Sequence, residues 1–160
     1  MNRIAIIALR VLILLIGVGA LGAQIVIVPV VARVVAENAD YPEFSVPYGV
    51  VGIVVIACVE VALVALWILL SMVQRGRIFS ARAFRFVDLI IGAGAVATVL
   101  VFLLNVHIYY VIEPHLDAPG IILVLLCLTI LGAAFVALLV VMRSLLRSAT
   151  SLQAELEEVV

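Results

Sequence analysis

One acidic residue stands alone inside a long apolar run, and its chemistry is the first question that this sequence raises. Glu60 is the one charged residue between Tyr48 and Val73. If this run crosses a membrane, a central carboxyl costs about 2.5 to 3.5 kcal/mol, so it normally faces the protein and marks a functional site. Glu60 can carry a proton or cation, recognise a ligand or, when protonated, hydrogen-bond and fix the helix register. Thr98 and Thr129 are predicted at similar depth, as hydroxyl partners for it.

Other residue types that bind metals or act as nucleophiles form no recognised site. Cys58 and Cys127 lie in different apolar runs, where cysteine behaves as a small apolar side chain, and they make no CxxC pair. Four residues of types that bind metals occur in or near a proline-containing loop, but their spacing matches no metal site: His107, Glu113, His115 and Asp117. The sequence has no Gly-rich phosphate loop and no nucleophile with a positioned base. We therefore expect no enzyme, no metal and no cofactor.

The elements that position Glu60 follow from the composition. Apolar residues make up 68% of the chain and charged residues 12%, whereas soluble domains are about half apolar. A bilayer core needs about 20 helical residues to cross it, and four segments reach that length: 11–32, 48–73, 87–110 and 119–142. In lipid such runs satisfy their backbone hydrogen bonds only as helices. The prediction is an all-α integral membrane four-helix bundle, one domain over residues 1–160, with the lipid bilayer as its first partner.

The first apolar run is also predicted to remain in the protein. It continues to Ala32, which is longer than the apolar region of a typical signal peptide, so we expect a helix there.

The arginines predict the orientation in the membrane. All nine basic residues are arginines, and eight fall on one side of the four predicted helices. Only Arg33 falls on the other side, beside Glu37, Asp40 and Glu43. The positive-inside rule therefore predicts that both termini lie in the cytoplasm. No basic stripe with interleaved aromatic residues is present, so we expect no direct contact with nucleic acid.

A basic turn between the second and third predicted helices reads "QRGRIFSARAFRFVD". Its arginines first serve to hold the turn in the cytoplasm. The apolar insertion within it predicts a second role, because Ser80 can cap an interfacial helix and Phe79 can enter the headgroup region. The candidate contact residues of the turn are Arg75, Arg77, Ile78, Phe79, Ser80, Arg82 and Arg85.

Two polar side chains are predicted to join the first and third helices. In lipid, helices associate through small residues and hydrogen bonds rather than through the hydrophobic effect. Gln24 shares a helix face with Gly17, and Asn105 shares one with Gly94. Because Gln24 and Asn105 both fall in the outer half of their helices, an amide hydrogen bond between them is expected to act as structural glue.

The tail at 143–160 is predicted to extend the fourth helix into the cytoplasm as an amphipathic helix. Leu145, Ala149, Leu152 and Leu156 keep a spacing of three or four residues, which gives one apolar stripe. The last turns are acidic, whereas membrane-surface helices are usually basic. The stripe is therefore predicted to contact a cytoplasmic protein or a second copy of the chain, although a solvated extension is the alternative.

The four spans, the Gly76, Ile78, Phe79, Ser80 pattern of the basic turn and the tail "ATSLQAELEEVV" together resemble the DUF2975 family of small bacterial membrane proteins. Family tails tend to end with an acidic residue and a Leu-Thr-like pair, from which "EEVV" departs. The family has no established activity. The resemblance implies a multi-pass protein of the bacterial inner membrane, and by genomic association a small helix-turn-helix regulator as its cytoplasmic partner. Two interpretations stay open: a sensory or regulatory membrane partner, and a small oligomeric proton or cation channel or transporter that uses Glu60.

Overall fold

The first half of the chain forms two long helical rods. The structure, a computed structural model, describes residues 3–38, 40–74, 81–116 and 119–158, and nearly all of these are helical. Helix α1 (Arg3–Gly22) continues through a π-helical turn, η1 (Ala23–Ile27), into α2 (Val28–Asn38). A short 3-10 turn, η2 (Pro42–Phe44), then leads into α3 (Ser45–Gln74).

The second half repeats this plan with a longer last helix. Helix α4 (Ala81–His107) passes through a second π-helical turn, η3 (Ile108–Ile112), into the short α5 (Glu113–Leu116). Helix α6 (Pro119–Glu158) is one element of 40 residues. At the rise of an α-helix that is about 60 Å, roughly twice the thickness of a bilayer core.

Four helical stretches among the described residues are long and apolar enough to cross a membrane: Ile6–Asn38, Pro42–Val73, Ala83–Ile112 and Pro119–Ser148. This confirms an all-helical protein with four candidate spans, and each span predicted from the sequence lies inside one of these stretches. In the most apolar window of any of them, at most 11% of the residues are buried within the protein. Most of the apolar surface is therefore left for lipid.

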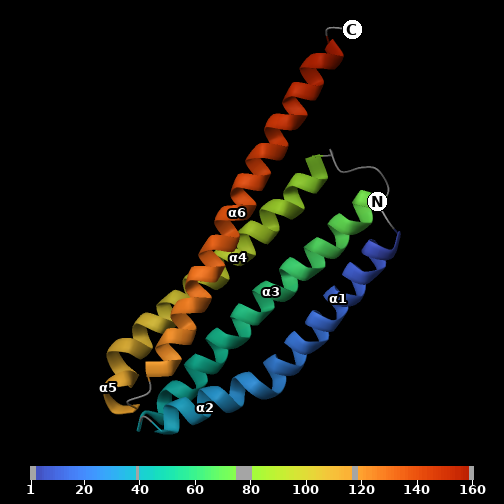
Figure 1. The fold of residues 1–160 in the computed structure, drawn as a ribbon. Coiled ribbons are helices and arrows are strands. Elements are labelled where there is room, and N and C mark those ends of the chain that lie inside the picture. The colour runs from blue at the N-terminus through green and yellow to red at the C-terminus, as the bar shows by residue number, and fades with distance from the viewer. Residues whose placement is uncertain (1–2, 39, 75–80, 117–118, 159–160) are drawn as a thin grey trace.

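The long helices lie side by side in a row (Figure 1). Extensive contacts join α1 and α2 to α3, α3 to α4, and α4 to α6. The row is more open than a bundle built around one shared core, and the physical reason is that lipid is as apolar as the side chains, so little drives the outer helices together. Helix α3 is thus an inner member, with α1 and α2 on one side and α4 on the other.

The row has two distinct ends. The start of α1 and the end of α6 lie at the same end, where α6 projects beyond the other helices (Figure 1). We call this the terminal end, and we call the opposite end, where η2 and α5 lie, the loop end.

At the loop end the chain leaves α2 through a turn that satisfies its last carbonyls. The backbone N–H of Tyr41 donates to the Ala36 carbonyl at 3.0 Å, and that of Asp40 donates to the Glu37 carbonyl at 3.3 Å. Asp40 has φ 61°, a left-handed conformation that aspartate tolerates better than most residues. This pattern is a Schellman motif, and it fixes the direction in which α3 sets out.

A compact core closes the loop end. Ala32, Tyr48, Ile108 and Ile112 are buried there against one another. Apolar side chains from α6, among them Ile121, Ile122 and Leu125, pack against the same core. All four spans therefore contribute to the packing at this end.

Glycines bring neighbouring helices close together. A Cβ atom added to Gly52 of α3 would lie 2.7 Å from Val28 Cγ1 of α2, and one added to Gly132 of α6 would lie 2.5 Å from Thr98 Oγ1 of α4. Both distances are shorter than real Cβ contacts, so a larger residue would fit at either position only if the Val28 or Thr98 side chain shifted. Small residues at helix contacts are the expected means of association in lipid.

Candidate functional site

Glu60 lines a groove between α1 and α3. The groove has a volume of about 450 Å³. The α3 residues of this face recur every three or four positions, as helical periodicity requires, and Glu60 and Trp67 are the first and last of them. Apart from Glu60 the lining is apolar, and its main members are Ile13, Gly17, Val18, Leu21, Leu63, Val64 and Trp67.

One oxygen of the Glu60 carboxyl is not satisfied by the described residues. This atom, Oε1, is buried and accepts no hydrogen bond from any described residue. A buried polar atom without a partner costs about 1 to 3 kcal/mol, and a charged one costs more. Such atoms are rare in native structures, so this one calls for a reason beyond packing.

Arg10 lies nearer the terminal end of the same interface and is engaged there. Its Nη2 donates to Ser71 Oγ at 3.3 Å, and its guanidinium carbon lies 5.2 Å from the centre of the Trp67 ring. Ser71 Oγ in turn donates to the Trp67 carbonyl at 3.0 Å. Because Ser71 is about 16 Å along the helix from Glu60, Arg10 stabilises the α1 and α3 contact at a different level from the carboxyl.

Thr98 and Thr129 are used within their own helices. Thr98 Oγ1 donates to the Gly94 carbonyl, and Thr129 Oγ1 donates to the Leu125 carbonyl, both at 2.8 Å. Thr98 faces a second apolar groove, of about 530 Å³, that α3, α4 and α6 enclose. Glu60 instead lines the groove on the side of α3 that faces α1. The structure therefore does not bring the two threonines to Glu60.

Gln24 and Asn105 do not meet. Gln24 Nε2 donates instead to the Ile53 carbonyl of α3 at 3.0 Å. Asn105 is 8% exposed, and its Oδ1 has no hydrogen-bond partner among the described residues. The predicted bond between them is not formed because α3 lies between α1 and α4 in the row. Gln24 still links two helices, but its partner is a backbone carbonyl.

An aromatic cluster at the loop end was not anticipated from the sequence. Tyr48 of α3 and His107 of α4 share a hydrogen bond of 3.0 Å between Oη and Nδ1. Phe44 packs on both rings, at centroid distances of 5.8 Å and 5.1 Å. Tyr41, Phe44 and Tyr48 recur at three- and four-residue spacing, which is the signal that indicates a shared helix face.

The cluster also bears on the metal ligands considered above. His107 Nδ1 is occupied by Tyr48. Asp117 and the side chain of His115 lie outside the described residues. In the part of the chain that is described, no three His, Cys, Asp or Glu side chains come together.

The terminal end carries an ion pair between α4 and α6. Arg143 donates from Nη2 to Asp88 Oδ2 at 2.8 Å. Arg85, three residues before Asp88 in the sequence, lines the same small pocket, together with Phe84 and Arg147. The pocket is mostly basic, and both partners of the pair are partly exposed.

Several predicted contact residues fall outside the described part of the structure. These are Arg75, Arg77, Ile78, Phe79 and Ser80 of the basic turn, together with the side chains of Arg82, Ala149, Leu152 and Leu156. The backbone shows that α4 begins at Ala81, directly after Ser80, and that α6 stays helical to Glu158. Leu145, the first residue of the predicted stripe, is exposed.

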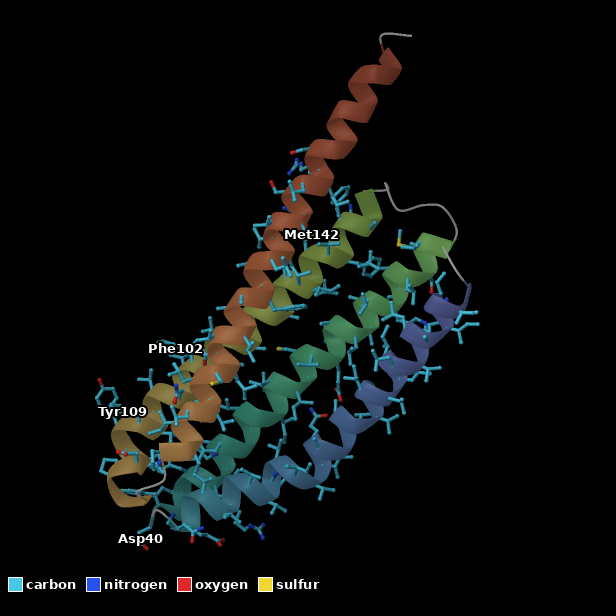
Figure 2. All side chains as sticks on the ribbon, in the orientation of Figure 1. Asp40, Phe102, Tyr109 and Met142 are labelled. Carbon is cyan, nitrogen blue, oxygen red and sulfur yellow. The ribbon has the colours of Figure 1, made fainter. Side chains whose placement is uncertain are left out.

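Figure 2 shows the side chains on the ribbon, with apolar carbon covering most of the row and Asp40 marking the loop end. A family model described as "Protein of unknown function (DUF2975)" matches residues 30–160, and so confirms the resemblance found in the sequence. No curated protein and no solved structure matches the chain.

Proposed function

This chain belongs to the DUF2975 family, and from that membership and its four candidate spans we propose a non-enzymatic, multi-pass protein of the bacterial inner membrane that binds a cytoplasmic protein. The observation that carries the proposal is the length of α6. This helix runs on to Glu158 beyond the end of the last apolar span at Ser148 and projects past its neighbours at the terminal end (Figure 1).

The projecting part of α6 is suited to contact with another protein. The helical backbone through Glu158 keeps the spacing on which the predicted stripe of Leu145, Ala149, Leu152 and Leu156 depends. A solvated apolar stripe is most stable when a partner covers it. Three glutamates, at positions 155, 157 and 158, follow closely. The partner surface that fits is therefore an amphipathic helix flanked by basic residues.

The orientation needed for this proposal is supported by charge. Arg10, Arg85, Arg143 and Arg147 lie toward the terminal end, and Arg33 lies toward the loop end beside acidic residues. Positively charged segments tend to stay in the cytoplasm. We therefore propose that the terminal end faces the cytoplasm. A small helix-turn-helix regulator is the partner that the family resemblance favours.

A photo-reactive residue placed at Leu152 in the native host tests the proposal. Irradiation is expected to link the chain to one cytoplasmic protein, identified by mass spectrometry. Leu131, an exposed residue of the same helix within the span, is the matched control and should link to lipid. Replacing Glu155, Glu157 and Glu158 by lysine should abolish the Leu152 product. If Leu152 captures only lipid or a second copy of the chain, the partner hypothesis is wrong.

A second candidate is the small oligomeric channel or transporter, and the unpaired carboxyl of Glu60 is the observation that favours it. The described spans offer no second carboxyl near Glu60. A chain of carboxyl groups that passes protons across the membrane would therefore need copies of Glu60 from an oligomer. Proton and cation flux into proteoliposomes should then fall strongly in Glu60→Gln. Equal flux in the two proteins, or none in the wild type, would remove this candidate.

A further inference from the structure

We propose that the groove between α1 and α3 binds an apolar molecule that carries a protonated amine, with the Glu60 carboxylate as the acceptor for that amine. This inference is independent of the role of α6. It rests on the unpaired carboxyl oxygen of Glu60, on the apolar lining of the groove and on the access to the groove from the lipid.

The carboxyl selects the chemistry of the head group. Oε1 of Glu60 is buried without a hydrogen-bond partner. A protonated amine supplies both an N–H donor and the opposite charge, and charge-assisted hydrogen bonds are about twice as strong as neutral ones. The Arg10 and Gln24 side chains on this interface already contact groups of α3, since Arg10 contacts Ser71 and Trp67 and Gln24 donates to the Ile53 carbonyl. Glu60 is thus left to define the head-group position.

The remaining lining selects an apolar body. The groove holds about 450 Å³, which is within the range of about 300 to 1,000 Å³ for small-molecule sites. Gly17 contributes to the space, because a Cβ atom added there would meet nothing within 4 Å. Glu60 and Trp67 mark the two ends of the α3 wall, about 10 Å apart. A chain attached to the amine can therefore extend from Glu60 toward Trp67.

The groove is open to the hydrocarbon. Leu14, Val18 and Val64 line it and are exposed by 56%, 68% and 61%. These side chains face lipid in a spanning helix, so an amphiphile dissolved in the bilayer reaches the groove sideways. Such an amphiphile places its apolar body in the environment that the lining provides and brings the amine to the carboxyl.

Trp67 makes the proposal testable, because it is the single tryptophan of the chain and lines the groove. The protein is reconstituted in phosphatidylcholine nanodiscs and titrated with a long-chain ω-bromoalkylamine, whose bromine quenches tryptophan on contact. We expect saturable quenching in the wild type. In Glu60→Gln, which keeps the shape of the side chain, the concentration for half-saturation should rise about tenfold or more, the ratio expected from losing one charge-assisted hydrogen bond.

Two further variants separate binding from folding. Gly17→Val places a branched side chain in the groove and leaves the carboxyl in place, so it should also raise the amine concentration for half-saturation. Gly19→Val is the matched control, because Gly19 is outside the groove lining and an added Cβ there meets nothing within 4 Å; it should quench like the wild type. Circular dichroism verifies the helical content of each variant.

A neutral probe defines the result that overturns the proposal. The ω-bromoalkanol of equal chain length should quench without saturation and equally in wild type and Glu60→Gln. If the alkanol saturates as the amine does, the groove takes neutral lipid and the amine proposal fails. It fails equally if Glu60→Gln binds the amine like the wild type, or if neither probe saturates because a second copy of the chain fills the groove.

Discussion

The loop end and the groove at Glu60 both place polar groups among apolar side chains, but the two regions differ in whether those polar groups find partners. At the loop end Tyr48 and His107 bond to each other across α3 and α4, and aromatic rings cover the pair. In the groove Glu60 faces α1 and its buried oxygen bonds to no described residue. Asn105 of α4 also has a buried oxygen without a hydrogen-bond partner among the described residues.

The difference separates the contacts that stabilise the row of helices from the polar group that stays available to bind a ligand. In lipid the helices gain little from burying apolar surface, so interhelical hydrogen bonds and close glycine contacts carry the association. The loop end has both. At the level of Glu60, the described residues of the groove form no interhelical hydrogen bond and no close glycine contact. A Cβ atom added to its glycine, Gly17, would meet nothing within 4 Å. A region that contributes so little to packing is free to bind.

The largest expected effect compares two glycines. Gly52→Ala should reduce the free energy of unfolding by about 1 to 3 kcal/mol, because the new Cβ would overlap Val28. Gly17→Ala should leave it unchanged or raise it by up to about 1 kcal/mol through helix propensity. The measurement is denaturation of the two variants by SDS in mixed micelles. Equal losses would mean that α1 packs on α3 as tightly as α2 does.

The next effect has the opposite sign. Glu60→Leu should raise the free energy of unfolding by about 1 to 2 kcal/mol, because it removes a buried oxygen without a partner and keeps a similar volume. Glu60→Gln, which leaves a polar group in place, should change it less. The same SDS titration measures both. A loss of stability in Glu60→Leu would show that the carboxyl supports the fold.

The smallest effect concerns the hydrogen bond at the loop end. Tyr48→Phe should reduce the free energy of unfolding by about 0.6 kcal/mol, the mean for such bonds between membrane helices. Tyr110→Phe is the control, because Tyr110 is exposed and should change nothing. If the two variants unfold alike, the bond to His107 adds nothing to the stability of this end.

The sequence predicts depth along a helix better than direction around it. The apolar runs locate the spans, and the lone charge of Glu60 marks the middle of one. The side of α3 on which Glu60 lies depends on the order of the helices in the row, which no local pattern specifies. The hydrogen bonds expected from Thr98 and Thr129 to Glu60, and from Gln24 to Asn105, fail for this reason.

A helix is predicted well where its apolar spacing continues in the sequence without interruption. The three- and four-residue spacing after Arg143 indicates a helix, and α6 continues through Glu158. The Tyr48 and His107 pair, in contrast, joins residues 59 positions apart. Aromatic spacing indicates the helix face on which Tyr48 lies, but no residue pattern near His107 predicts that Tyr48 is its hydrogen-bond partner.

The π-helical turn η1 divides the first span into two α-helices, α1 and α2. In η1 the N–H of Val28 bonds to the carbonyl of Ala23, five residues earlier, so one extra residue is accommodated within the turn. Deleting a single residue from Ala23–Ile27 would restore α-helical bonding and leave α1 in nearly the same phase relative to α2, because the wider turn already takes up the extra residue. Gly17 would then still line the groove with Glu60 while α2 kept its contact with α3. The groove should therefore tolerate the loss of one residue at η1, because this turn can absorb a change in chain length between α1 and α2.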